Sequence, residues 1–484
     1  MKPLVAAVML CAGLAGCAAV GPDYAGPPAS TADLTAAFAS AQEGADSAVS
    51  AAAPPVQWWR QLADPALDAL MDQALAANYE LRVAGANVAA ARALLAEVDT
   101  RKRPTVDGNA RAQAQRNASA QFPGADPDRR QPNLVGASGS LDLAWELDLF
   151  GRVRRSIEAA SAELGSAEAL RNAVMTAVLA DVARAYIDLR GAQMRLAVAL
   201  RNVEVQRQTL DLVTVLNAEG AATELDVARA RTQLLNSQAT MPRLRADAVA
   251  ALNRLTTLTA QAPGALSAGL ATPRPLPVLP EFLTTGSPVE LLRRRADIQA
   301  AERALAAASA RIGVATAELF PTVSFTGRVG VGAAQLSDLT AAGAPFFALG
   351  PTITWNLFDR GAIHARIRQA DAGAAARLAR YEATVTTALE ETDSALNAWL
   401  NERVRREQLR QANTTSEEAS RLARLRYREG VEDFLTVLDA ERNQLAVEDQ
   451  LALSEIEVAQ TLIDIHRALG GGWETPPAGG GALP

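Results

Sequence analysis

The sequence holds few of the residues on which catalytic and metal sites depend. Its 484 residues include two cysteines and two histidines. His364 and His466 lie far apart, on helical patterns among charged residues, and we expect both at the surface rather than at a metal. Only Cys17 remains beyond the expected signal segment, so no disulfide forms and packing must supply the stability. We therefore predict no enzyme activity, no metal site and no bound cofactor.

The chain also lacks a basic excess and a long apolar run. Lys and Arg number 47 against 54 Asp and Glu, which argues against nucleic acid as a partner. After the first 16 residues no run of about 18 apolar residues occurs, so we expect no membrane-spanning helix.

The first 16 residues have the pattern of a secretory signal peptide. Lys2 precedes an apolar stretch that is too short to span a bilayer, and small residues then precede Cys17, as in a bacterial lipobox. We expect Cys17 to carry a diacylglycerol and an N-acyl lipid. Ala18, in place of an aspartate, favours the outer membrane. The alternative is a plain signal peptide with an incidental cysteine.

The sequence contains an internal two-fold repeat. Three pairs of segments match: 103–106 with 320–323, 149–152 with 357–360, and 219–229 with 429–439. Proline and glycine landmarks argue against chance similarity between alanine-rich helices. We predict a first repeat over 58–270 and a second over 271–469. A lipidated, extended segment over 17–57 precedes them, and a flexible tail over 470–484 follows.

Very long helices are predicted in both halves. Apolar residues recur every three or four positions over 64–102, 151–216, 223–259, 288–319, 361–428 and 431–469. A helix of about 65 residues is roughly 100 Å long, which no compact domain holds. A coiled coil or a tube of helices fits this pattern.

Four segments alternate strictly between apolar and polar residues, over 105–116, 133–149, 321–332 and 346–358. A period of two with one apolar face predicts half-buried strands, each long enough to cross a bilayer when tilted. Four strands cannot close a barrel, so copies of the chain must complete it. A patch of a soluble β-sandwich is the alternative.

Several motifs resemble the TolC-like outer-membrane factors of tripartite efflux systems, in particular their lipoprotein subgroup. These are Cys17 with Val20-Gly21-Pro22-Asp23-Tyr24, Trp58-Trp59, Asn78-Tyr79-Glu80-Leu81, and the stretch from Ser287-Pro288 to Phe320-Pro321. Ala296 departs from the subgroup's usual proline, and we expect only a softer helix start there.

The resemblance implies a mixed α and β membrane protein in the outer membrane of a Gram-negative bacterium. Three chains would form a twelve-stranded outer-membrane β-barrel, four strands per chain, continued by a long periplasmic α-helical barrel. It also implies a periplasmic adaptor (membrane fusion) protein and an inner-membrane pump, of the RND type, as partners.

The resemblance further implies a gate at the periplasmic tip, closed at rest. Gly220 and Gly430 would form its helix turns, and Asp439 matches a carboxylate that rings the pore. Tyr427 matches a tyrosine that ties neighbouring helices, with Asp226 as its acidic partner. Relatives vary between acid and base at Glu432, so its role stays open. The acidic residues and Tyr427 could instead be ordinary solvated helix positions.

Three functions fit parts of this pattern. A passive export channel for small molecules such as drugs or toxic compounds uses both the helices and the strands. A structural coiled-coil lipoprotein that spans the periplasm explains the helices but not the strands. A hydrolase using Glu390 and Glu391 is disfavoured, because neighbouring residues point in different directions on a helix. The sequence does not predict the cargo.

Overall fold

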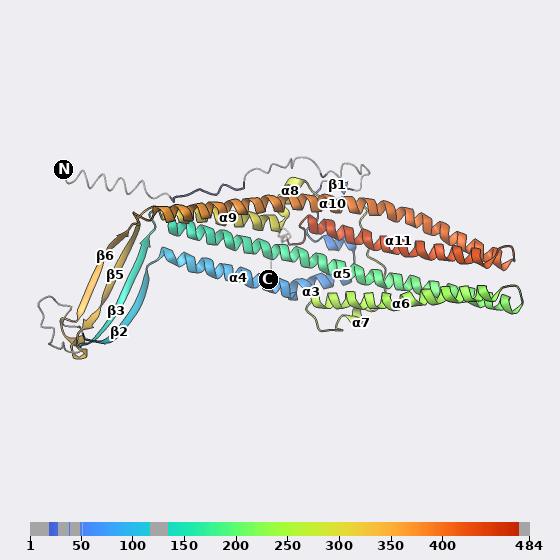
Figure 1. Ribbon diagram of the computed structural model, residues 1–484, viewed down its shortest axis with the longest axis horizontal. Helices are drawn as coiled ribbons and strands as arrows, with labels where there is room; N and C mark the ends of the chain where they lie inside the picture. Colours follow the sequence, from blue (N-terminus) through green and yellow to red (C-terminus); the bar gives the residue numbers. More distant parts are fainter. Residues whose placement is uncertain (1–18, 28–37, 39–48, 51, 117–133, 474–484) are drawn as a thin grey trace, which may run out of the picture. The chain divides into compact units, whose positions relative to one another are not determined.

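The computed structural model describes residues 19–27, 38, 49–50, 52–116 and 134–473 (Figure 1). The predicted signal peptide, Cys17, the loop over 117–132 and most of the predicted tail lie outside these residues. The chain divides into two units. The first unit comprises residues 1–28, 89–166 and 301–381, and the second comprises 29–88, 167–300 and 382–484.

The first unit contains one antiparallel sheet with the strand order β2-β3-β5-β6, whose four strands lie side by side in Figure 1. The strands are β2 (Thr105–Gln115), β3 (Leu134–Leu147), β5 (Thr322–Ala333) and β6 (Pro345–Thr354), and a short 3-10 helix η4 (Leu336–Thr340) lies between the last two. They form because apolar residues recur at every second position, alternating with polar or small ones along most of each segment. Pairing of β3 with β5 joins the two halves of the sequence, and β2 and β6 are left as the edges.

The segment before the first helix is bound to the helices next to the sheet. The Val20 amide donates to the Phe150 carbonyl at 3.1 Å. The buried Arg155 guanidinium donates to the Val20 carbonyl at 3.1 Å and to Asp23 at 2.5 Å. The Tyr24 hydroxyl donates to Glu302 at 2.9 Å. These bonds fix residues 20–24, the stretch whose motif follows Cys17.

Most of the described residues lie in α-helices, which range from four to 69 residues in length. They are α3 (Pro65–Ala77), α4 (Tyr79–Asp99), α5 (Arg152–Ala218), α6 (Glu224–Leu258), α7 (Ser267–Leu270), α8 (Pro288–Arg294), α9 (Ala296–Ala317), α10 (Arg360–Arg428) and α11 (Phe434–Ala468). Short 3-10 helices η1 (Trp58–Leu62) and η2 (Thr100–Lys102) and a parallel pair, β1 (Val49–Ser50) with β4 (Leu283–Thr284), complete the described elements. None of the described helices is both long and apolar enough to span a membrane.

The predicted continuous helix over 64–102 is wrong, because it is interrupted at Asn78. This residue has an extended ψ of 133° between α3 and α4. Its side-chain amide donates to the Leu258 carbonyl at 2.8 Å, and its side-chain oxygen accepts from the Glu80 amide at 2.9 Å. The break therefore caps α4 and attaches it to the end of α6.

The predicted continuous helix over 288–319 is also wrong, because it breaks at Arg295, with ψ 118°. The guanidinium of Arg295 donates to Glu391 at 2.7 Å, to the Ala468 carbonyl at 3.1 Å and to both oxygens of Asp297. The following helix begins at Ala296, so the break persists where relatives have proline.

The prediction of a surface position is wrong for His466, although His364 is exposed as predicted. His466 is 2% exposed and its ring stacks on Trp58, with centroids 4.8 Å apart and an angle of 9°. The last turns of α11 bury their apolar side against η1, and position 466 falls on that side. Burial lowers the pKa of His466 to about 3, so the imidazole is neutral.

Candidate functional site

Two turns in the second unit join the long helices in pairs and have the same backbone geometry. Gly220 has φ 76°, and the Gly220 and Ala221 amides donate to the Asn217 and Leu216 carbonyls. Gly430 has φ 70°. In the same way, the Gly430 amide donates to the Tyr427 carbonyl and the Val431 amide donates to the Arg426 carbonyl. This is the Schellman motif, in which glycine takes the left-handed conformation that ends a helix.

The helix that follows each turn begins at a polar cap. Thr223 caps α6, accepting from the Asp226 amide, while the Asp226 carboxylate accepts from the Thr223 amide at 3.1 Å and hydroxyl at 2.6 Å. Asp433 caps α11 and accepts from the Thr436 amide at 2.9 Å. The bonds from Thr436 lower the pKa of the Asp433 carboxyl. Asp226 therefore has a local structural role, whatever its part in a gate.

The two turns pack together through an apolar cluster, which we call the tip cluster. Its buried members are Val213, Ala230, Ala423, Phe434, Val437 and Leu438, which come from α5, α6, α10 and α11. Half-buried apolar neighbours complete it, and the Tyr427 ring lies 5.6 Å from that of Phe434. Because all four long helices contribute, a shift of either helix pair disturbs the cluster.

Tyr427 lies at the edge of the tip cluster, and its buried hydroxyl has no hydrogen-bond partner among the described residues. Burial, and to a lesser extent the negative charge of Asp226, raise the pKa of Tyr427. The structure therefore brings the predicted pair near each other without a hydrogen bond. A tie between Tyr427 and Asp226 across helices stays a prediction.

The two remaining predicted gate residues differ in their surroundings. Asp439 is exposed on α11, in the second turn of the helix, and forms no ion pair with any residue that the structure describes. Glu432 accepts from Arg426 at 3.0 Å across the turn, so part of its charge is compensated locally. Asp439 is thus the one of the two with a free carboxylate.

Glu441 is a carboxylate near the tip that the sequence reasoning missed. It is 4% exposed, accepts from the Thr209 hydroxyl at 2.9 Å and lies 3.8 Å from the Arg424 guanidinium. Burial raises the pKa of its carboxyl. Its spacing from Phe434, Val437 and Leu438 places it on the buried face of α11, which would have identified it.

A second candidate surface is the apolar face of the sheet, where large side chains stay accessible. Between 54% and 78% of the residue surface remains exposed at Val106, Leu141, Val329, Phe347, Leu349 and Ile353. A sheet in water normally buries such a face, so this one requires an apolar partner.

Two tryptophans stand at the helix end of this apolar face. The indole of Trp145 donates to the Lys102 carbonyl and that of Trp355 to the Leu319 carbonyl, both at 3.1 Å. Both residues are partly exposed, Trp145 to 37% and Trp355 to 48%. An apolar ring body with a polar N–H suits a boundary between lipid and water.

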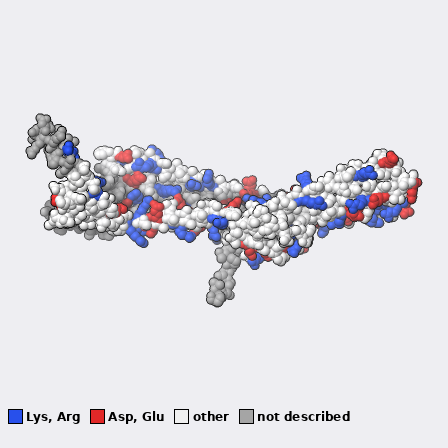
Figure 2. All heavy atoms as spheres, turned by 90° about the horizontal axis from the view of Figure 1, so that it is seen from below, with Lys and Arg blue, Asp and Glu red and all other residues white. Residues whose placement is uncertain are grey.

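The helices have a different surface. Figure 2 shows basic and acidic side chains interspersed over them, and many pairs form bridges, such as Arg195 with Asp449 at 2.9 Å. No group of three or more potential metal ligands occurs among the described residues. Neither observation indicates a reaction centre in the described part of the chain.

Comparison with known proteins shows what kind of protein combines these features. A family model described as outer membrane efflux protein matches residues 70–261 and 287–471. The chain belongs to this family. The resemblance to TolC-like outer-membrane factors is thereby confirmed.

The similarity to individual family members extends over nearly the whole chain. Outer membrane protein OprJ of Pseudomonas aeruginosa is 33% identical over 97% of this chain and 96% of its own length. Toluene efflux pump outer membrane protein TtgI of Pseudomonas putida is 31% identical over 97% and 98%. The solved outer-membrane channel OprN superposes with a TM-score of 0.86 at 41% identity, over 94% of this chain and 99% of that one.

Proposed function

We infer that this chain is the outer-membrane channel component of a tripartite efflux system. The observation that carries this function is the sheet, which has one exposed apolar face and a polar face on the opposite side. Such a sheet fits lipid on one side and water on the other. Its occurrence in a chain of the outer membrane efflux protein family supports transport across the outer membrane.

We propose that the channel is a homotrimer. Edge strands β2 and β6 have unpaired backbone groups on their outer sides, and open edges are not tolerated in lipid. Joining β2 of one copy to β6 of the next, three times, closes a twelve-stranded barrel. The long helices of three copies would form the periplasmic tube below it.

The membrane boundary follows from the ends of the strands. Trp145 and Trp355 would mark the periplasmic interface of the barrel. Cys17, the proposed lipidated residue, precedes Val20 by three residues, and Val20 is bound to Phe150 at the same end of β3. The acyl chains would therefore enter the inner leaflet beside the barrel, and the integral protein would be lipid-anchored as well.

The tip cluster and its turns would form the periplasmic gate, closed at rest. Three copies of Asp439 near the axis would repel one another and attract cations. Tyr427 and Asp226 would hold the helices together, and the salt bridge of Glu432 with Arg426 would stiffen the turn. Gly220 and Gly430 permit the turns themselves.

Conduction through the channel would be passive. A periplasmic adaptor and an inner-membrane pump, which we propose is of the RND type, would deliver small molecules such as drugs or toxic compounds and supply the energy. The relative TtgI is named as a component of a toluene efflux pump, which supports a small toxic molecule as the kind of cargo.

A structural coiled-coil lipoprotein is the second candidate, and the 67 and 69 residues of α5 and α10 favour it. A structural coiled coil does not explain why the sheet has an exposed apolar face. The two functions differ in the behaviour of the purified mature chain. We expect a trimer in detergent that dissociates on heating and conducts ions in planar bilayers. A monomer that stays soluble in water without its acyl group would overturn the channel.

A further inference from the structure

Two charged side chains on β2 have no partner among the residues that the structure describes. Asp107 and Arg111 lie four residues apart on the polar face of the strand, so their Cα atoms are roughly 13 Å apart. Neither side chain makes a hydrogen bond or an ion pair with any residue the structure describes. On an edge strand with one wet face, such charges act on whatever passes that face.

The other charges on this face compensate one another. Arg328 on β5 donates to both oxygens of Asp142 on β3, and the side-chain amide of Asn109 donates to the same carboxylate. Glu146, nearer the helices, is paired with Arg152. Asp107 lies directly opposite Asp142 in the strand register. The carboxylate of Asp142 cannot neutralise the charge of Asp107, and the two like charges repel each other.

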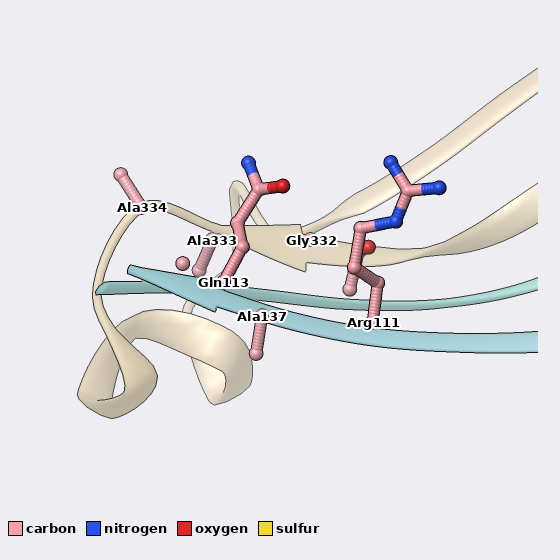
Figure 3. Close-up of a pocket in the computed structure, with 8 residues that line it drawn as sticks. Arg111, Gln113, Ala137, Gly332, Ala333 and Ala334 are labelled. Carbon is pink, nitrogen blue, oxygen red and sulfur yellow. The ribbon is translucent and has the colours of Figure 1, made fainter. Parts of the chain in front are cut away.

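Arg111 is unpaired for a different reason, because its neighbours across the sheet are small. Ser138 lies opposite it on β3, and Gly332 lies beyond Ser138 on β5. These residues, with Gly136 and Gln113, border a hollow of about 330 Å³ (Figure 3). In that view Arg111 and Gln113 point to one side of the sheet and Ala137 to the other. Arg111 therefore lines this hollow without a charged residue opposite it in the described strands.

We infer that Asp107 and Arg111 set the charge preference of the passage through the barrel. This inference rests on the proposed trimeric channel, in which they form an acidic ring and a basic ring at two depths. Each ring favours ions of the opposite sign, as rings of charged side chains do in pores. The charges of Asp142 and Arg328 cancel because these side chains are paired. The negative charge of the Asp107 ring and the positive charge of the Arg111 ring then offset each other, and the passage accepts cations, anions and zwitterions without strong preference.

A reporter thiol between the rings tests this inference. Ser140 pairs with Asn109, halfway between Asp107 and Arg111, so Ser140→Cys places a thiol between the two charges. Purified trimers would be treated with a cationic and an anionic methanethiosulfonate of similar size, with the parent protein that keeps Ser140 as the blank. The ratio of the two reaction rates measures the local potential and does not require an open gate.

Opposite shifts are expected from the two variants. Arg111→Gln should raise the cationic-to-anionic rate ratio by about threefold at low ionic strength, and Asp107→Asn should lower it by about as much. The double variant should return near the parental ratio, and high salt should shrink all three effects. The matched controls Arg377→Gln and Asp371→Asn remove the same charges from exposed positions of α10 and should leave the ratio unchanged.

The inference and the proposed function fail in different ways. A thiol that reacts with both reagents at an unchanged ratio in both variants would overturn the inference and leave the channel intact. A thiol that reacts only after denaturation would show that the polar face lines no water-filled passage. That result would overturn the proposed channel and the inference with it.

Discussion

Replacing Tyr427 with phenylalanine tests whether the tip is held closed by contacts between copies of the chain. Within one chain the Tyr427 hydroxyl is buried and has no partner among the described residues. Leaving a buried hydroxyl unpaired costs about 1 to 3 kcal/mol. A closed gate would remove that cost if a helix of a neighbouring copy supplied a hydrogen-bond acceptor.

The expected size of the effect follows from the number of such bonds. One hydrogen bond contributes about 1 kcal/mol net, so three equivalent bonds in a trimer contribute about 3 kcal/mol. Removing them shifts the ratio of open to closed channels by roughly a hundredfold. Asp439→Ala should act in the opposite direction, because it removes the repulsion between three carboxylates at the closed tip as well as the charge that attracts cations.

The assay is single-channel recording in planar bilayers. We expect Tyr427→Phe alone to raise the mean conductance, since the tip loosens, and Asp439→Ala added to it to offset part of that rise. Tyr79→Phe, which removes a hydroxyl from an exposed ring on α4, serves as the control. An unchanged conductance together with a higher melting temperature would refute the reasoning, because the hydroxyl would then be unpaired in the trimer too.

Two further predictions concern stability. His466 is neutral in the folded chain with a pKa of about 3, against a usual value of 6.5, so the unfolded state binds the proton more tightly. The free energy of unfolding should fall as the pH drops from about 6.5 towards 3, by up to about 1.4 kcal/mol per pH unit. His466→Phe keeps the stacking on Trp58 and removes the titrating group. The melting temperature of this variant should therefore depend less on pH between pH 7.5 and 5. Arg295→Leu should destabilise the chain by about 2 to 3 kcal/mol in thermal denaturation, since Glu391 and the Ala468 carbonyl lose their hydrogen-bond donor. Arg295→Lys should be less destabilising than Arg295→Leu but still less stable than the parent, because lysine lacks the planar guanidinium that donates to several acceptors at once. An equal melting temperature for Arg295→Leu and the parent would contradict this.

The strands and turns were predictable because local chemistry decides them. Alternation with a period of two fixes which residues can share a sheet face, and β2 occupies 105–115 where 105–116 was expected. Both glycine turns were visible because only a left-handed residue ends these helices so sharply. The last strand ends at Thr354 rather than near 358, because Leu357 bonds back to Trp355 in a turn.

The positions missed depend on partners far away in the sequence. Asn78 breaks its helix by binding Leu258, and Arg295 does so while binding Glu391 and Ala468. Within a single helical window Asn78 looks like an ordinary interior position, and at Arg295 only the helix start expected at Ala296 pointed to a break. His466 likewise reads as a polar residue near a helix end until Trp58 is known to cover it. Tertiary contacts, rather than propensity, decide such sites.

What one chain leaves unpaired indicates how copies must meet. The free edges are β2, from the first half of the sequence, and β6, from the second. A contact between unlike edges is head-to-tail and closes into a ring only if each copy is rotated by the same fixed angle. Every interface in that ring joins first-half elements of one copy to second-half elements of the next. The same rule then holds for the helix pairs, so the partner of the buried Tyr427 hydroxyl on α10 should come from α5 or α6 of a neighbouring copy.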